Sequence, residues 1–292
     1  MMKKNRLTRL LRWAGGKKQL IPNLIKRVPP QFNNYHEPFV GGGAMVYEME
    51  ILSLLKNKKI YILDKNEELV SFYRVIKTRP KKFISEVEEL IIKKLDTFGR
   101  DEEYNAFYYD IRDWDRDTEL FKSKSKLIKA ARFLYLNKSC FNGLYRVNKS
   151  GYFNVPFDRT KKNVAYSSEI ILSWSKMLKR AEIASGDFSQ LSKSIKKGDF
   201  VYLDPPYYPI TETSFTTYTE SGFDQKDHER LKDFCDLINK KKAYFLLSNS
   251  YHDNLKHIYK KYKIETVGAR RSINSKKDGR GKVPELLISN YL

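Results

Sequence analysis

The alternation of apolar and polar positions predicts strands and helices in turn along both ends of this chain. Short apolar runs that stop at turn or acidic residues are typical of buried strands. The expected strands cover roughly 35–40, 59–64, 199–203, 243–247 and 285–291. Helices are expected at about 44–55, after Asn66, and after Asp224, whose carboxylate can cap an amphipathic run. This order favours a doubly wound α/β sheet with helices on both faces.

The middle of the chain has a different pattern. Apolar residues at helical spacing in 83–95 and an acidic, aromatic stretch at 96–119 predict helices and a loop. A basic segment follows at 122–162, and its sequence Asn148-Lys149-Ser150-Gly151 is typical of a tight turn. We therefore expect an α/β domain interrupted by a mainly helical inserted subdomain that carries a β-hairpin.

The charge distribution suggests a polyanionic partner. The 292 residues are 41% hydrophobic and carry a formal net charge of +21 at pH 7, so a sizeable core is combined with a basic surface. Eleven Lys or Arg residues fall in 122–162 against one acid, whereas 96–119 holds nine acids and three arginines. This separation favours nucleic acid as the partner. A general preference for lysine in an AT-rich genome is the alternative.

The remaining composition narrows the class further. The two cysteines and four histidines show no metal-ligand spacing, so we expect a reduced protein without a structural metal. No apolar run is long enough for a signal peptide or a membrane span. We expect a cytoplasmic monomer, from a prokaryote or a phage-infected cell, with no membrane partner.

Asp204-Pro205-Pro206-Tyr207 is the most informative motif. It follows the apolar run 200–203, and its two prolines end the strand because neither can donate a backbone hydrogen bond. A carboxylate, two carbonyls and an aromatic ring are thereby fixed at the carboxyl end of a strand, where open α/β sheets bind ligands. This set suits an exocyclic amine on a flat heterocycle. A proline turn with a solvated aspartate is the alternative.

Three further motifs suggest a nucleoside-bearing ligand. The turn 37–43 has an acid and three glycines, but Val46 replaces the third glycine of the dinucleotide fingerprint. A glycine turn with an acid just before it suits a ligand with an α-amino group and no phosphate, such as S-adenosylmethionine. Asp64 can accept hydrogen bonds from ribose hydroxyls or cap a helix. Asp187-Phe188 can bind and stack on adenine or form an ordinary turn.

Other segments contain groups suited to ligand or DNA contacts. Trp13-Ala14-Gly15-Gly16-Lys17 allows a close backbone approach, with Lys17 available to a carboxylate, or is a plain glycine turn. The segment 137–156 has side chains suited to base edges, stacking and phosphates, or is a hairpin with a solvated face. The basic loop that begins at Arg270 is suited to binding phosphates.

Taken in order along nearly the whole chain, these motifs resemble the Dam-type DNA adenine-N6 methyltransferases, the α class of amino-methyltransferases. The matching segments are 13–17, 37–43, 64–66, 132–158, 204–207, 269–273 and 282–286. The resemblance implies a Rossmann-like fold dependent on S-adenosylmethionine. It implies a catalytic domain formed by 1–75 and 168–292, and a DNA target-recognition subdomain at 76–167.

The resemblance also implies methyl transfer from S-adenosyl-L-methionine to N6 of adenine in double-stranded DNA, within GATC, by base flipping. The implied catalytic residues are Asp204, Pro205, Pro206 and Tyr207. The implied cofactor residues are Trp13, Lys17, Glu37, Phe39, Gly41, Gly43, Asp64, Asp187, Phe188 and Asp204. The implied DNA contacts are Asn137, Asn142, Leu144, Arg146, Asn148, Asn154, Pro156, Arg270 and Arg271. Among these, Arg146 is expected on guanine, with Leu144 and Pro156 on thymine. Where the family often has Tyr-Gly-Tyr, this chain has Ser139-Cys140-Phe141.

Three other functions compete with this interpretation. An amino-methyltransferase acting on RNA or on a protein glutamine could use the same tetrapeptide, but the large basic insert favours duplex DNA. A non-enzymatic DNA-binding protein is disfavoured by the intact Lys17, Asp204 and Tyr207. A nucleotide-dependent dehydrogenase is disfavoured by the missing third glycine.

Overall fold

The computed structural model describes residues 10–13, 17, 19–162, 164, 166–208, 223–270 and 282–292, without the side chains at 269, 270, 282 and 283. It divides into two compact units. We call Met1–Gly16 with Asn66–Ile183 the helical unit, and Lys17–Lys65 with Ala184–Leu292 the sheet unit. The units assign no function by themselves, so the division into catalytic and recognition parts stays a prediction.

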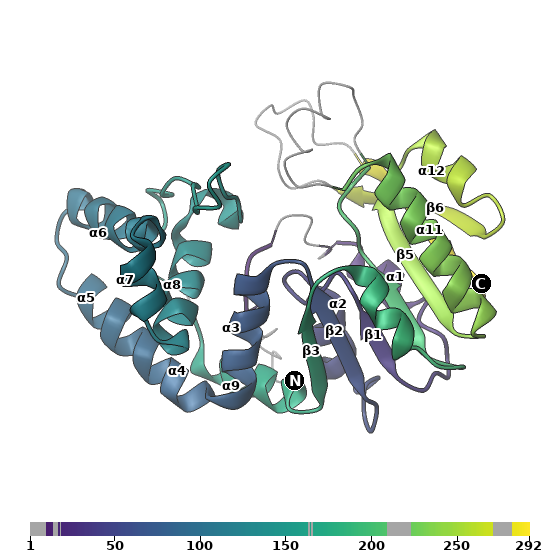
Figure 1. Ribbon diagram of the computed structural model, residues 1–292, viewed down its shortest axis with the longest axis horizontal. Coiled ribbons are helices and arrows are strands. Elements are labelled where there is room, and N and C mark those ends of the chain that lie inside the picture. Colours follow the sequence, from purple (N-terminus) through teal and green to yellow (C-terminus); the bar gives the residue numbers. More distant parts are fainter. Residues whose placement is uncertain are drawn as a thin grey trace, which may run out of the picture. The chain divides into compact units, whose positions relative to one another are not determined.

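In the described part of the chain, seven strands form one sheet in the order β3-β2-β1-β4-β5-β7-β6 (Figure 1). They are β1 (Tyr35–Glu37), β2 (Ile60–Asp64), β3 (Ala181–Ser185), β4 (Phe200–Leu203), β5 (Tyr244–Ser250), β6 (Lys263–Arg270) and β7 (Lys282–Ser289). β1 is parallel to β2 and β4, and β4 is parallel to β5, whereas β7 is antiparallel to both β5 and β6. The strand order reverses between β1 and β4, which is where open α/β sheets bind ligands.

Helices cover the sheet within its own unit. They are α1 (Ile21–Ile25), α2 (Ala44–Ile51), the 3₁₀ helix η4 (Phe188–Lys193), α11 (Gln225–Lys240) and α12 (Asp253–Ile258). α11 packs along β5 (Figure 1) and buries Leu231, Phe234 and Ile238 against the sheet. Successive residues of a strand face opposite sides of the sheet. Val201 and Leu203 therefore join this core, while Tyr202 between them faces away.

The helical unit is an assembly of short helices around α8. Its elements are α3 (Glu67–Thr78), α4 (Pro80–Val87), the π-helical turn η1 (Glu88–Ile92), α5 (Lys93–Leu95), α6 (Asp101–Asp113), η2 (Trp114–Arg116), α7 (Thr118–Ser123), α8 (Lys126–Ser139), η3 (Phe141–Gly143) and α9 (Ser168–Leu178). α8 packs against α3, α4 and α6. A hairpin at 144–157 follows, closed by an isolated antiparallel bridge between Val147 and Phe153.

The mixed α/β architecture predicted from the sequence is confirmed, and several predicted element ends are wrong. β5 continues to Ser250 instead of ending at 247, and β7 spans Lys282–Ser289 instead of 285–291. β1 ends at Glu37 instead of continuing to residue 40, because Pro38 cannot donate to the ladder. α2 ends at Ile51 instead of 55, since Ser53 adopts a left-handed φ of 61° that a helix cannot contain. Among the described residues, no helix has both the length and the apolar character needed to cross a bilayer.

Candidate active site

The turn 204–208 is anchored to the neighbouring strand β5 by one buried asparagine. Asn249 is 0% exposed. Its Oδ1 accepts a hydrogen bond from the backbone N–H of Tyr208 at 3.0 Å, and its Nδ2 donates to the carbonyl of Pro206 at 3.3 Å. Because both prolines lack an N–H, this side chain supplies hydrogen bonds that a strand ladder cannot. The turn is therefore fixed at the carboxyl edge of β4.

The carboxylate of Asp204 binds a buried cation. Its Oδ1 lies 3.0 Å from Nζ of Lys17, which is 6% exposed, and accepts a hydrogen bond from Oγ of Ser248 at 3.1 Å. The Tyr202 hydroxyl lies 2.9 Å from the same Ser248 oxygen. Both contacts fall on Oδ1, and no described residue donates to Oδ2. One carboxylate oxygen is therefore held by the protein while the other keeps its acceptor capacity.

Lys17 also contacts the aromatic residue of the motif. Its Nζ donates to the hydroxyl of Tyr207 at 2.8 Å and lies 4.0 Å from the centre of that ring. The Tyr207 hydroxyl in turn donates to Oε1 of Glu285, on β7, at 2.9 Å. Lys17 thus connects the first and last residues of the tetrapeptide, and Glu285 fixes the tyrosine from a third strand.

Charge interactions within this group shift its pKa values. Burial opposes the charged form of Lys17, but Asp204, Tyr207 and Glu285 together raise the pKa of its ammonium above the ordinary value. Burial raises the pKa of Asp204, and Lys17 opposes that change. Burial also raises the pKa of Tyr207 to about 12, so its phenol stays protonated at neutral pH. Lys17 remains a cation and favours the ionised form of Asp204.

The two carbonyls of the motif have different environments. The Pro206 oxygen accepts from Asn249, whereas no donor in the described part of the chain reaches the Pro205 oxygen. The Pro205 carbonyl and Oδ2 of Asp204 are therefore two adjacent acceptors of this turn that the described residues leave available.

The glycine turn after β1 is tied to the end of β2. The N–H of Gly41 donates to Oδ2 of Asp64 at 2.9 Å, and Gly41 and Gly43 have φ values of 46° and 64°. Side chains with a Cβ rarely adopt such angles, which explains glycine at both positions. Asn66, not Asp64, caps the following helix by accepting from the N–H of Leu69. The alternative role of Asp64 as a helix cap is therefore wrong.

Glu37 supplies a buried acid beside this turn. It is 2% exposed and accepts a hydrogen bond from the Tyr35 hydroxyl at 2.8 Å. Burial raises the pKa of Glu37 well above its usual value, and that hydrogen bond only partly opposes the change. A desolvated carboxylate of this kind favours a cationic partner.

Two aromatic rings and an ion pair come from the turn after β1, which contains Phe39, and from the segment after β3, which contains Asp187 and Phe188. The rings of Phe39 and Phe188 have centroids 5.5 Å apart. Asp187 begins the short helix η4 by accepting from the N–H of Ser189, and its Oδ1 lies 2.9 Å from Nη2 of Arg230. Burial opposes the ionised form of Asp187, but these donors lower its pKa overall. Asp187 is thus a turn residue whose carboxylate is already partnered.

Trp13 lies in the helical unit. Its ring stacks on Tyr145 with centroids 5.8 Å apart. Ala14, Gly15 and Gly16 of the same motif fall outside the described residues.

The hairpin 144–157 presents alternate residues outward. Phe153 and Val155 are buried in the core of the helical unit, while Pro156 is exposed and Asn154 is partly exposed. The exposed Arg146 donates from Nε to Oδ1 of Asn154 at 2.7 Å and from Nη2 to its carbonyl at 3.2 Å. Three of the predicted DNA contacts, Arg146, Asn154 and Pro156, therefore occupy one outward-facing strip.

The other predicted DNA contacts have different surroundings. Asn137 is buried. Its Oδ1 accepts from the backbone N–H of Arg12 at 2.8 Å, and its Nδ2 donates to the Arg12 carbonyl at 2.6 Å. Oδ1 of Asn148 accepts from the backbone of Ser150 and Tyr152 and so closes the hairpin turn. The remaining positions are Leu144, which packs partly buried against the core of its unit, and Asn142, which is exposed with a φ of 57°. The side chain of Arg270 and the whole of Arg271 lie outside the described residues.

Three residues of the site do not appear in the sequence-based set. Ser248 and Asn249 follow the apolar part of β5, so their polar character at the end of a buried strand was a usable signal. Glu285 gave no such signal, because it contacts Tyr207 only through the pairing of β7 with β5, where it lies opposite Ser250.

Metal and thiol chemistry receive no support from the described residues. Among them, no group of His, Cys, Asp and Glu has the geometry of a metal site. Cys140 and Cys235 are free and buried. Burial raises the pKa of Cys140 to about 11 and that of Cys235 well above its usual value, so neither is a ready thiolate nucleophile.

The Rossmann-like sheet and the acceptor-rich turn at its switch point are those of a methyltransferase, and the comparisons name the family. The chain belongs to the D12 class N6 adenine-specific DNA methyltransferases, whose family model matches residues 13–273. The type II methyltransferase M1.LlaDCHI of Lactococcus lactis subsp. cremoris is 38% identical over 296 residues, covering 100% of this chain and 99% of the relative.

Two further relatives match along nearly their whole length. The type II methyltransferase M.MjaIII of Methanocaldococcus jannaschii is 38% identical over 292 residues, covering 96% of this chain and 98% of the relative. The DNA adenine methylase of Escherichia coli strain K12 is 32% identical over 289 residues, covering 98% of this chain and 95% of the relative. The predicted enzyme class, an adenine-specific DNA methyltransferase, is confirmed.

Proposed function

We propose that this protein transfers a methyl group from S-adenosyl-L-methionine to N6 of adenine within GATC in double-stranded DNA, after turning the base out of the helix. One observation carries the proposal: Oδ2 of Asp204 and the Pro205 carbonyl are adjacent acceptors left available by the described residues, beside the ring of Tyr207. An adenine amino group has two N–H donors and a flat aromatic face, which match these acceptors and this ring.

The catalytic roles follow from those contacts. Asp204 and the Pro205 carbonyl accept hydrogen bonds from the two N6–H groups, which withdraws the nitrogen lone pair from the ring and aims it at the methyl donor. The N6–carbon bond forms as the sulfur–carbon bond breaks, a neutral thioether leaves, and N6 loses one proton. Lys17 holds Asp204 in its ionised, acceptor-only form. Tyr207 stacks on the base, its position fixed by Glu285. Since Asp204 and Tyr207 are both held in place before substrate arrives, orientation contributes much of the rate.

The residues of the glycine turn fit S-adenosylmethionine. The cofactor supplies an electrophilic methyl group on a sulfonium. In the sheet unit, the buried Glu37 suits its ammonium, the Asp64 carboxylate suits its ribose hydroxyls, and Phe39 with Phe188 suits its adenine. The complete proposed set is Trp13, Lys17, Glu37, Phe39, Gly41, Gly43, Asp64, Asp187, Phe188 and Asp204.

Sequence recognition is assigned to the hairpin. Arg146 reads guanine through its O6 and N7 acceptors, the commonest specific arginine contact in the major groove. Leu144 and Pro156 contact thymine, and the other proposed DNA contacts are Asn137, Asn142, Asn148, Asn154, Arg270 and Arg271. Because Arg146 is exposed and held by Asn154, its guanidinium is oriented before DNA arrives. Under this proposal the enzyme acts as a cytoplasmic monomer without a metal.

Base flipping is part of the proposal because of where the target atom lies in duplex DNA. N6 of adenine is paired inside a duplex, and a group buried in the stack cannot reach acceptors on a protein turn. Unstacking costs a few kcal/mol, which stacking on Tyr207 partly offsets.

The test combines methyl transfer with digestion. Purified protein is given tritiated S-adenosylmethionine with duplex DNA, single-stranded RNA or a glutamine-bearing protein, and we expect label in the DNA alone. The methylated DNA is then cut with GATC endonucleases of opposite methyl sensitivity. Resistance to the enzyme that methylation blocks, together with cutting by the enzyme that requires it, supports the proposal. Label without a change at GATC contradicts the site, and label in RNA contradicts the substrate.

A further inference from the structure

The hairpin 144–157 has few cross-strand backbone hydrogen bonds: Asn148 donates to the carbonyl of Tyr152 at 2.9 Å, and Asn154 donates to that of Arg146 at 3.0 Å. Its strands share one isolated bridge, between Val147 and Phe153. Two-stranded hairpins with so few cross-strand bonds are marginally stable in water. Since Asn154 holds Arg146 and both lie on this hairpin, the orientation of Arg146 also depends on the contacts that hold the hairpin from outside.

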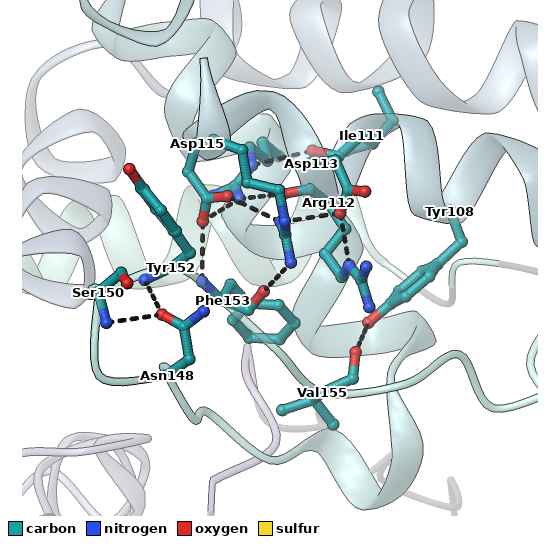
Figure 2. A network of polar contacts seen from close by, with 12 residues as sticks. Tyr108, Ile111, Arg112, Asp113, Asp115, Asn148, Ser150, Tyr152, Phe153 and Val155 are labelled. Carbon is teal, nitrogen blue, oxygen red and sulfur yellow. Dashed lines mark hydrogen bonds and ion pairs between the residues drawn. The ribbon is translucent and has the colours of Figure 1, made fainter. Parts of the chain in front are cut away.

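Outside contacts come from Tyr108 in α6 and from Asp115 and Arg116 in η2; Tyr108 and Asp115 are labelled in Figure 2. Oδ2 of Asp115 accepts the backbone N–H of Phe153 at 2.9 Å, and Nη2 of Arg116 donates to the carbonyl of Phe153 at 3.3 Å. Both backbone groups of one hairpin residue are thus bound by adjacent side chains of η2. The Tyr108 hydroxyl donates to the carbonyl of Val155 at 2.8 Å and holds the same strand two residues further on.

Asp115 is itself fixed by a buried cation. Arg132, on α8, is 1% exposed, and its Nη2 lies 2.8 Å from Oδ2 of Asp115. Its Nε and Nη2 also donate to the carbonyls of Ile111 and Arg112 at 3.0 and 2.7 Å, and its Nη1 lies 3.4 Å from Oε1 of Glu68. Buried charges of this kind hold one geometry because any displacement leaves a desolvated charge unpaired. Arg132 therefore makes Asp115 a rigid acceptor for the hairpin.

The position of Phe153 decides where Asn154 points. Successive side chains of a strand face opposite sides, so a shift of one residue would turn Asn154 inward and Phe153 outward. Asn154 is the residue that holds the Arg146 guanidinium, at 2.7 Å. The chain of contacts from Arg132 through Asp115 and Phe153 to Asn154 thus ends at the side chain assigned to guanine.

We propose that Asp115, held by Arg132, is a positioning residue for DNA sequence recognition. It sets the register of the hairpin and thereby the orientation of Arg146, without touching DNA. This inference rests on the proposed function, because it assumes that Arg146 reads a base.

The test measures discrimination, not activity alone. The ratio of kcat/KM for the GATC duplex to that for a duplex with the guanine replaced is determined for Asp115→Asn. Asn keeps the shape but offers one acceptor oxygen where Asp115 uses both, to Arg116 on one side and to Arg132 and Phe153 on the other. We expect discrimination to fall roughly 5- to 150-fold, the range of a lost bidentate base contact, with S-adenosylmethionine affinity unchanged.

We call Asp115 and Arg116, which bind the two backbone groups of Phe153, the clamp. One control lies on the neighbouring helix α6, and a second variant changes the other clamp residue. Asp110→Asn makes the same chemical change at an exposed position of α6 and leaves discrimination unchanged. Arg116→Met removes the donor to the Phe153 carbonyl, at a side chain that is 33% exposed. If Asp115→Asn does not fold, this variant tests whether the clamp controls discrimination. It is expected to relax discrimination in the same direction. Backbone hydrogen exchange at 147–156 rises in both clamp variants and not in Asp110→Asn.

A double-mutant comparison separates the two proposals. If Asp115 acts through Arg146, adding Asp115→Asn to Arg146→Ala causes no further loss of discrimination. Relaxed specificity in Arg146→Ala with wild-type specificity in the clamp variants overturns the role of Asp115 alone. Fully additive losses also overturn it. Wild-type specificity in Arg146→Ala itself overturns the assignment of guanine reading to that arginine, and the positioning role falls with it.

Discussion

The ammonium nitrogen of Lys17 lies 3.0 Å from Oδ1 of Asp204 and 2.8 Å from the hydroxyl of Tyr207. One buried cation therefore holds both ends of the motif that the proposed reaction uses. It also favours the negatively charged form of Asp204. The acidic groups around Lys17 raise its own pKa, against the effect of burial. Lys17 therefore both favours the charge of Asp204 and fixes the position of Tyr207.

Replacing Lys17 should shift the pH dependence of the reaction. Burial raises the pKa of Asp204 and Lys17 opposes it, so Lys17→Met raises that pKa further. The reaction needs the ionised carboxylate, and activity is lost as pH falls through its pKa. We expect the acid limb of the kcat–pH profile to move to higher pH in this variant. Lys240→Met, at an exposed position of α11, should leave the profile unchanged. An unmoved acid limb in Lys17→Met would argue against this role.

Removing the acceptor should abolish catalysis more than binding. Asp204→Ala deletes the carboxylate but leaves Glu37 and the glycine turn intact. We expect kcat to fall by about 10²–10³-fold or more, as when one preorganised hydrogen-bonding group is lost from an active site. S-adenosylmethionine affinity, measured by calorimetry, should be reduced and not lost. Asp233→Asn, whose side chain is 79% exposed, is the matched control. Full activity in Asp204→Ala would remove the proposed mechanism.

Cofactor binding should be linked to a proton on Glu37. Burial raises the pKa of this acid, and a cationic ligand binds its ionised form. Binding then releases a proton at pH values below the folded pKa, so affinity should strengthen with rising pH by up to about tenfold per unit and level off above that pKa. Glu37→Gln should weaken binding and flatten this dependence. Calorimetry in buffers of different ionisation enthalpy measures the proton directly. An equal slope in wild type and Glu37→Gln would exclude Glu37.

The anchor of the catalytic turn should matter for both stability and rate. Asn249→Ala leaves the N–H of Tyr208 without its acceptor and the Pro206 carbonyl without its donor. We expect the free energy of unfolding to fall by about 1–3 kcal/mol and kcat to fall while DNA affinity is kept. Urea denaturation and steady-state kinetics measure the two effects. Asn239→Ala, exposed at the end of α11, should change neither. An unchanged kcat in Asn249→Ala would mean that the turn holds its shape without this residue.

The strands and the turn formed by residues 204–207 could be located from the sequence because their signals are local. An apolar run followed by Pro205 and Pro206 defines where β4 ends, whatever the rest of the chain does. Glu285 could not be placed, since its contact with Tyr207 depends on the long-range pairing of β7 with β5. The hydrogen bonds of the Asn137 amide with the backbone of Arg12 could not be predicted either, because they join segments far apart in the chain.

The placement of β7 has a consequence for when the contact between Glu285 and Tyr207 forms during synthesis. β7 is translated after the other described strands, yet it lies between β5 and β6 and brings Glu285 to the tyrosine of the catalytic turn. A nascent chain that has emerged only as far as β6 lacks this strand and the acid that steadies Tyr207. The contact between Glu285 and Tyr207 can therefore form only after the last described strand has paired with β5.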